Sequence, residues 1–358
     1  MELCVPLTLI ISDMKKQLSI ILIATLGLGS VWAGNPDRAG SAGASQLLIN
    51  PWAASNGLVG ANMASVRGLE SVFTNVAGLA FIDKSELITS NSIYLSGTGI
   101  RLNSVGFATK MGSSGVLGFT VTSVTFGDIP ITTEDLPEGG IGTFSPSFSN
   151  IGISYAKEFS NTIYAGFTLR ILGEAISNVK AGGIAFDAGI RYVTGENDKM
   201  RFGISLRNVG PPMRYAGDGL TVTATPQGSS GALTVLQRSE RYELPSLVNI
   251  GIAYDVVTEE NMVVELNGMF TSNSFTKDQF GFGTEARIGK NLELRAGYLW
   301  EQGLGSDETV STAYTGPAGG LTIKLPTGSS GTEIGLDYSY RTTNPFNGTH
   351  SIGVKISI

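Results

Sequence analysis

The segment KAGGIAFDAGIRYV, residues 180–193, alternates strictly between two kinds of side chain. One series is apolar and consists of Ile184, Phe186, Ala188, Ile190 and Tyr192, whereas the intervening series carries the charges. A period of two residues is the signature of a β-strand, because successive side chains point to opposite faces of a sheet. The fold must therefore offer the two faces of such a strand different environments.

About fourteen segments of this kind are predicted between residue 86 and the C-terminus. Each is close to the length of about 9–11 residues that a tilted strand needs to cross a bilayer. The predicted strands cover residues 86–96, 100–111, 116–126, 148–158, 161–173, 180–194, 199–209, 245–257, 262–272, 278–289, 291–302, 313–325, 331–342 and 347–358.

The charged side chains of these segments fall on the face opposite the apolar series, and both signs occur there. The predicted inward-facing charges are Arg170, Asp187, Arg191, Arg201, Arg207, Glu265, Glu285, Arg287, Glu293, Arg295, Glu301, Asp337, Arg341 and Lys355. Alternation alone would also suit a secreted soluble β-protein with its charges in water. In a membrane, a charge on the lipid face costs about 2–4 kcal/mol at mid-bilayer, so charges turn to the lumen.

Composition and loop lengths favour the membrane. Only 15% of residues are charged, and 48 of 358 are glycine. Long connections at 127–147, 210–244 and 303–312, and intermediate ones at 174–179, 273–277 and 343–346, largely alternate with short turns. Backbone groups in lipid must all be paired, so the sheet has to close. We therefore predict that residues 85–358 form an all-β, antiparallel transmembrane barrel of about 14 strands in a bacterial outer membrane.

The first 84 residues lack this alternation. Residues 1–33 read as a signal peptide with its true start at Met14, because two lysines precede an apolar stretch and the sequence VWA precedes Gly34. Residues 34–84 contain several apolar side chains and are predicted to form a short helical or irregular plug in the lumen. A disordered leader is the alternative for this second segment.

The sequence offers few residues for chemistry. Cys4 lies ahead of the expected cleavage site and His350 is the only histidine, so no His/Cys metal site is expected. Glu134, Asp135 and Glu138 lie together in a predicted external loop, where they either bind Ca²⁺ or are simply solvated. With a net charge of −6 and scattered basic residues, a nucleic-acid partner is not expected. No cofactor and no enzymatic activity are predicted.

Four stretches of the chain resemble the PorV/PorQ group of outer-membrane proteins, which are relatives of the FadL-type barrels. They are GLESVFTNVAGLA at 68–80, GDIPITTEDLPEGGIGTFSPS at 127–147, the strand pair AGGIAFDAGIRY and RFGISLRNVGPPMRY, and THSIGVKISI at 349–358. The resemblance implies a plug signature of Asn75, Ala77, Gly78 and Leu79. The chain departs from the group at Val76, where proline is usual, and at the terminal Ile358, where phenylalanine is usual.

This resemblance implies a 14-stranded barrel with an N-terminal hatch and an accessory, cargo-handling role in type IX secretion or surface assembly. The expected partners are then outer-membrane lipid, a secretion translocon and secreted cargo. The alternative is a FadL-like passive transporter of hydrophobic solutes. The mixed lumen charges fit either a polar, solute-selecting channel or a salt-bridged wall around the plug, and the two signs favour the wall.

Overall fold

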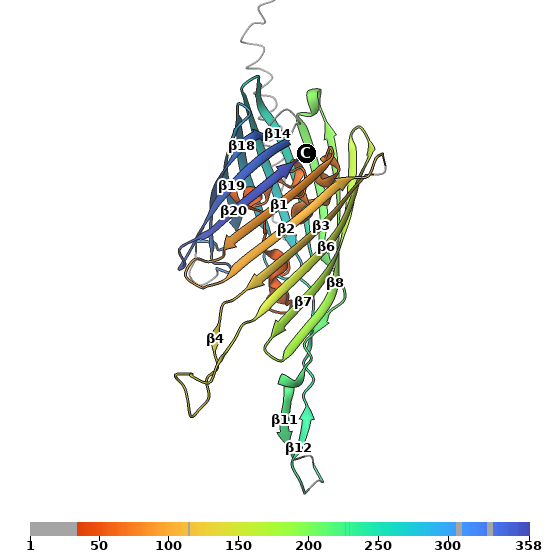
Figure 1. Cartoon of the computed structure of the whole chain (residues 1–358). Helices are drawn as coiled ribbons and strands as arrows, with labels where there is room; N and C mark the ends of the chain where they lie inside the picture. The colour runs from red at the N-terminus through yellow and green to blue at the C-terminus, as the bar shows by residue number, and fades with distance from the viewer. Residues whose placement is uncertain (1–33, 114, 226, 229, 306–309, 328–331) are drawn as a thin grey trace, which may run out of the picture. The chain divides into compact units, whose positions relative to one another are not determined.

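The structure, a computed structural model, describes residues 34–358 except 114, 226, 229, 306–309 and 328–331 (Figure 1). The expected signal peptide, residues 1–33 with Met14 and Cys4, lies outside the described residues. Within the described part of the chain, no helix is long and apolar enough to cross a membrane.

The described residues from Ser85 onward form a closed antiparallel barrel of fourteen strands, in which β1 pairs with β20. The prediction of an all-β barrel of about 14 strands is therefore confirmed. The barrel strands are β1 (Ser85–Ile93), β2 (Arg101–Lys110), β3 (Val116–Thr125), β6 (Ser147–Ser160), β7 (Ile163–Ile176), β8 (Val179–Thr194), β9 (Met200–Val209), β14 (Leu247–Glu259), β15 (Met262–Asn273), β16 (Gln279–Ile288), β17 (Leu292–Glu301), β18 (Tyr314–Thr327), β19 (Thr332–Thr343) and β20 (Thr349–Ser357).

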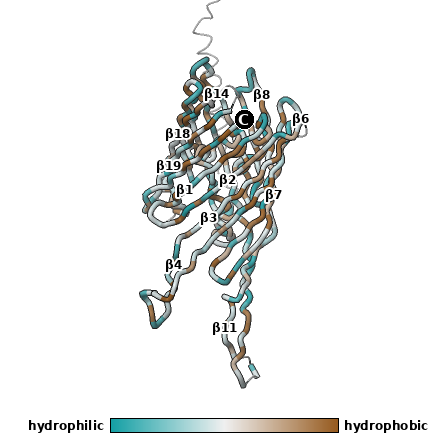
Figure 2. Tube along the Cα trace, viewed as in Figure 1, coloured by the Kyte–Doolittle hydropathy of each residue, from teal (hydrophilic) through white to brown (hydrophobic). Residues whose placement is uncertain are grey.

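The two faces of the wall differ as the alternation requires. On β8, Ile184 and Ile190 are 42% and 55% exposed, whereas Ala185 and Asp187 are 0% and 3% exposed. Brown residues are interspersed with white and teal ones along the strands in Figure 2. Closure leaves the sheet no unpaired edge, and the apolar series faces outward around the barrel.

Two long connections leave the barrel at the end opposite the C-terminus (Figure 1). The connection after β3 contains β4 (Ile129–Pro130) paired with β5 (Thr143–Phe144). The connection after β9 contains two stacked hairpins, built from β10 (Met213–Arg214), η6 (Asp218–Leu220), β11 (Thr221–Ala224), β12 (Leu233–Leu236) and β13 (Arg241–Tyr242). Short turns, one with η5 (Glu196–Asp198), lie at the other end, which we take as periplasmic.

The prediction of a connection of intermediate length at 174–179 is wrong. Strands β7 and β8 stay paired up to Ile176 and Val179, so only Ser177 and Asn178 form the turn. Ser177 has a φ of 50°, in the left-handed region that two-residue hairpin turns require. The small residues around this turn, including Gly173 opposite Gly182, hide the alternation of the continuing ladder.

Residues 34–82 lie inside the barrel as a chain of short helices and are hereafter called the plug. Its elements are η1 (Pro36–Arg38), η2 (Ser45–Leu48), α2 (Ala53–Gly57), η3 (Ala61–Ala64), α3 (Ser71–Thr74) and η4 (Val76–Phe81). Close approach to the wall depends on paired glycines: a Cβ built on Gly57 would lie 3.1 Å from Gly320 Cα. The plug therefore fills much of the lumen.

Candidate functional site: the plugged lumen and its cavities

Apolar contacts attach the plug to one side of the wall. Trp52, Leu69, Val72, Phe73 and Leu79 form a buried cluster with wall residues Ile88, Ala108, Val116 and Ala156. These wall residues come from β1, β2, β3 and β6 and point inward. Burial of large apolar side chains stabilises such a contact by about 1.5–3 kcal/mol each, so the plug is a folded part of the barrel.

The plug signature lies at the start of η4. Asn75 Oδ1 accepts a hydrogen bond from Ala77 N at 3.2 Å, and Asn75 Nδ2 donates to the carbonyl of Ile190 on β8 at 3.1 Å. Gly78 packs against the Val66 carbonyl, where a Cβ would clash. Leu79 is fully buried. Asn75 therefore caps η4 and fastens it to the wall.

Three buried wall arginines donate hydrogen bonds to plug carbonyls. The pairs are Arg170 Nη2 to Val72 O at 2.9 Å, Arg207 Nη2 to Leu47 O at 3.2 Å, and Arg191 Nη2 to Val66 O. Arg170 also forms an ion pair with Asp187 at 2.6 Å. These charges are thus engaged by the plug and by each other through charge-assisted hydrogen bonds.

A second set of charges forms a network of alternating sign across β9 and β14–β18. Its ion pairs are Arg201–Asp255 at 2.5 Å, Arg201–Glu265 at 3.2 Å, Arg287–Glu265 at 3.3 Å, Arg287–Glu285 at 3.5 Å, Arg295–Glu285 at 2.7 Å, Arg295–Glu293, and Lys324–Glu293 at 2.7 Å. A cavity of about 160 Å³ separates this network from plug residues such as Arg67 and Glu70. The network makes this part of the lumen polar.

The remaining predicted charges also lie on the lumen side. Asp337 accepts a hydrogen bond from Thr322, and Lys355 lies 3.6 Å from Glu70 of the plug. Glu301 accepts from Gln279 Nε2 at 2.8 Å. The Arg341 guanidinium lies over the Tyr314 ring at 3.7 Å. Among the residues that the structure describes, none forms an ion pair with Arg341.

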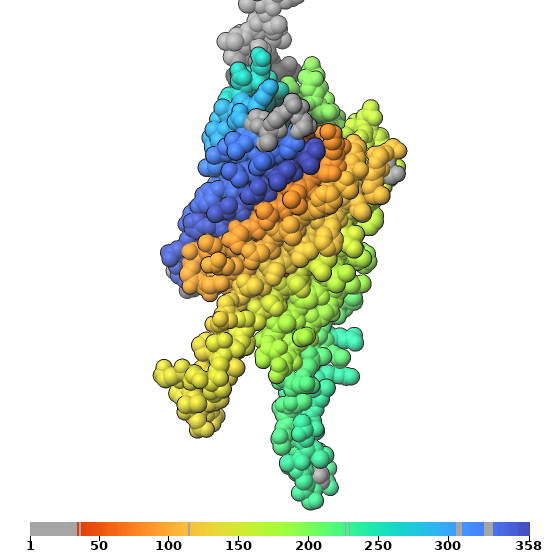
Figure 3. All heavy atoms as spheres, in the orientation of Figure 1, coloured from red at the N-terminus to blue at the C-terminus, as the bar shows by residue number. Residues whose placement is uncertain are grey.

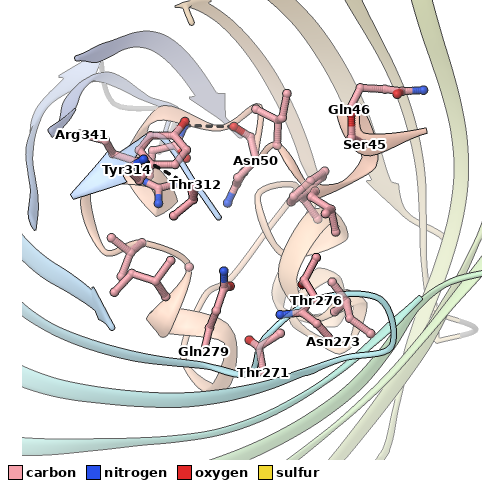
Figure 4. Close-up of a pocket in the computed structure, with 18 of the residues that line it drawn as sticks. Ser45, Gln46, Asn50, Thr271, Asn273, Thr276, Gln279, Thr312, Tyr314 and Arg341 are labelled. Carbon is pink, nitrogen blue, oxygen red and sulfur yellow. Dashed lines mark hydrogen bonds between the residues drawn. The ribbon is translucent and has the colours of Figure 1, made fainter. Parts of the chain in front are cut away.

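A cavity of about 530 Å³ lies between the plug and the external end of the barrel. Figure 4 shows side chains around it from the plug (Ser45, Gln46, Asn50), from β15 and β16 (Thr271, Asn273, Gln279), and from the region of β18 and β19 (Thr312, Tyr314, Arg341). Apolar groups complete the lining: Phe73, Leu95, Phe126, Phe148, Leu247, Met269 and Leu299. We call this space the external cavity. Sequence reasoning missed it, because its lining comes from elements far apart in the chain.

The base of the β10–β13 hairpin holds the plug near this cavity. Gln46 Nε2 and Tyr242 OH donate to Glu174 at 2.8 and 2.9 Å, and Tyr215 OH donates to the same carboxylate. Beneath them, Leu47 packs with Met213 and other apolar residues. Burial, together with the hydrogen bonds to Glu174, raises the pKa of both tyrosines above the ordinary range.

The external-loop acids Glu134, Asp135 and Glu138 are exposed near the tip of the connection between β4 and β5. Across the described ranges, no group of three or more His, Cys, Asp or Glu side chains is placed to hold a metal ion. His350 lies on the outward face, where its Nδ1 is 2.9 Å from Tyr338 OH. We therefore place the candidate site in the lumen.

No protein-family model matches the chain, and no curated protein matches its sequence. Among solved structures, the Pseudomonas putida toluene transporter TodX superposes with a TM-score of 0.55 at 11% identity, over 86% of this chain and 98% of TodX. A TodX monoaromatic hydrocarbon channel with the deltaS2 mutation gives 0.50 at 12% identity, over 86% and 97%. A Pseudomonas aeruginosa FadL homologue gives 0.49 at 11% identity, over 85% and 96%.

The chain therefore has a fold similar to that of the outer-membrane β-barrel TodX. The apolar outward face, the closed sheet and this likeness confirm the predicted location in the bacterial outer membrane. At these low identities the likeness extends to the fold alone. The type IX assignment and the identity of any solute remain proposals.

Proposed function

We propose that this barrel passes a small amphipathic solute from outside the cell into the outer membrane. The observation that carries the proposal is the external cavity, whose volume of about 530 Å³ lies in the range of small-molecule sites. Its lining combines apolar side chains with a few polar groups. TodX, whose fold is similar, is a toluene transporter.

The solute has an apolar body and an anionic or strongly hydrogen-bonding group. Phe126, Phe148 and Leu247 offer apolar contacts, while Arg341 offers a guanidinium without an ion-pair partner in the described part of the chain. A charge-assisted hydrogen bond contributes about 1.5–3 kcal/mol, enough to favour an anion over a neutral analogue.

The way out of the cavity leads through the wall and not through the plug. Below the cavity lie the plug and the ion-pair network. An apolar solute passing there would displace water from those charges, which is costly. Beside the cavity, the β17–β18 ladder ends at Tyr298 and Pro317. A register shift follows in β18, with Gly316 at a φ of 108°. Leu299 and Tyr314 flank this interruption and line the cavity.

A second candidate is the accessory role in type IX secretion or surface assembly. It is supported by the two external connections, which reach beyond the barrel and expose apolar side chains. These are Ile129, Ile131, Leu136 and Ile141 on one, and Val222, Leu233 and Leu236 on the other. Both connections project from the barrel in Figure 3. Exposed apolar residues on projecting hairpins are typical of protein-binding surfaces. Neither candidate involves catalysis.

Uptake of a paired acid and neutral analogue tests the first candidate. Arg341→Gln should slow uptake of a small aromatic acid roughly tenfold or more, and uptake of the corresponding neutral hydrocarbon should stay near the wild-type rate. Arg101→Gln, an exposed arginine outside the cavity, is the matched control. If Arg341→Gln takes up each of the two solutes at the wild-type rate, the proposed role of the cavity is wrong.

Deletion of residues 221–236 separates the two candidates. This hairpin lies outside the barrel wall and away from the residues that line the cavity. A transporter should keep its uptake after the deletion, whereas a secretion accessory should lose partner co-purification and cargo export with the barrel still folded. Loss of export with unchanged uptake would favour the second candidate.

A further inference from the structure

The first residues of the plug are fastened to the external end of the barrel. Asn35 N donates to Asn273 O at 3.3 Å, and Gly43 N donates to Glu243 O at 3.0 Å. Arg38 Nη2 forms an ion pair with Glu243 at 2.9 Å, and its guanidinium lies 4.2 Å from the centre of the Phe275 ring. Residues 34–43 thus run along the mouth that the solute would enter.

Gly34 is packed closely against the loop between β15 and β16. A Cβ built on Gly34 would lie 2.7 Å from Asp278 Oδ1 and 2.8 Å from the carbonyl of Thr276, which is too close for any side chain. Asp278 is 2% exposed. The backbone nitrogen of Gly34 is bonded to the same Cα, about 1.5 Å away, so it lies no more than about 5 Å from this carboxylate oxygen.

The sequence places the expected cleavage site at this same residue. Hydrolysis of the Ala33–Gly34 peptide bond by a signal peptidase consumes one water molecule and leaves a carboxylate on Ala33. It also leaves an α-amino group on Gly34. Because the ordinary pKa of an α-amino group is about 8, that group takes up a proton and is a cation at neutral pH.

We infer that processing after Ala33 creates an ammonium group at Gly34 that forms an ion pair with Asp278 and fastens the start of the plug at the external mouth. A buried carboxylate is most stable when a cation lies within about 4 Å, and the amide nitrogen of an uncleaved chain carries no charge. The pair therefore exists only in the mature protein. It couples processing to the attachment of residues 34–43 at the external end of the barrel.

This inference goes beyond the proposed function and does not depend on what passes through the barrel. It rests on the expected cleavage, which has its own readout. N-terminal sequencing of the protein extracted from outer membranes should begin at Gly34. Any other mature start would overturn the inference while leaving the transport proposal intact.

Labelling of a buried cysteine tests the ion pair itself. The mature chain contains no cysteine, so Ala44→Cys, at a position only 6% exposed, provides a single probe in the plug. A membrane-impermeant maleimide is added to intact cells that express the full chain. Asp278→Asn removes the carboxylate, and two glutamines inserted between Ala33 and Gly34 move the ammonium away without changing any native side chain.

Each change should make the probe react about tenfold faster. The two changes together should give no more than either alone, since both break one interaction. Glu240→Gln, an exposed carboxylate in the neighbouring hairpin, should leave the rate unchanged. The inference is overturned if either single change leaves the wild-type rate, or if the two effects multiply. The insertion variant keeps the test valid if Asp278→Asn fails to fold.

Discussion

Lys355 on β20 and Glu70 in the plug form an ion pair inside the barrel, with Nζ and Oε1 3.6 Å apart. The other Glu70 oxygen accepts a hydrogen bond from Ser55 of the plug at 3.1 Å. This pair joins the last barrel strand to a segment about four fifths of the chain away. The contribution of this ion pair to stability therefore tests whether the plug and the wall form one folded unit.

Removal of the lysine should destabilise the barrel. Lys355→Met leaves the Glu70 carboxylate buried without its cation, at a cost of roughly 3–5 kcal/mol. The temperature at which the heat-modifiable gel band shifts should fall accordingly. The double variant Lys355→Met with Glu70→Gln should recover most of the loss, and Lys110→Met, on an exposed lysine, should have no effect. A double variant no better than the single would show that the two groups do not interact.

The outward face should reject charge. Phe167→Arg or Phe202→Arg places a cation among outward apolar residues, at a cost of about 2–4 kcal/mol near the midplane. Gln279→Arg is the inward control, because this side chain points into the external cavity beside Glu301. Fractions of folded protein in membranes should therefore be low for the first two variants and near normal for the third. Equal assembly of all three would reverse the assignment of faces.

The start of η4 should depend on Asn75 and tolerate proline at the next residue. Asn75→Ala removes a cap and a bond to the wall, which costs roughly 1–2 kcal/mol. Val76→Pro should leave stability unchanged or raise it. Asn75 has the extended backbone that precedes proline, and the first position of a helix needs no N–H. A strong loss of folding in Val76→Pro would show that this departure from the PorV/PorQ pattern is structurally required.

The contact between the β10–β13 hairpin and the plug should weaken at alkaline pH. The raised pKa of Tyr215 and Tyr242 means that the folded state holds their protons more tightly than the unfolded chain. Their contribution is therefore complete below the unfolded value of about 10 and is lost as pH rises above it. Protease cleavage within 34–50 should increase above that pH. The double variant Tyr215→Phe with Tyr242→Phe should be cleaved by the protease at a rate that changes little across the same pH range.

The barrel could be predicted because alternation is a local property. The face of each strand follows from residues two apart, so Asp187 and Arg191 could be assigned to the lumen before their partners were known. Small residues defeat this reasoning, as at Gly173 and Gly182, where no side chain marks a face.

The site could be predicted only in part. The lumen charges are visible in the sequence, but their partners are plug carbonyls such as Val72 O and Leu47 O, which any residue supplies. The plug has no periodicity from which to infer its path. The external cavity depends on that path, since Asn50 and Phe73 of the plug complete its lining.

Uptake into liposomes by the purified barrel tests the central claim, that the external cavity lies on the solute's route. Thr312→Trp fills part of the cavity from its rim, where the Thr312 side chain is one of those drawn in Figure 4. The wild type should speed entry of a small aromatic acid over protein-free liposomes, and Thr312→Trp should lower that rate roughly tenfold or more, with the barrel still heat-modifiable. Unchanged entry through a folded Thr312→Trp barrel would contradict the claim.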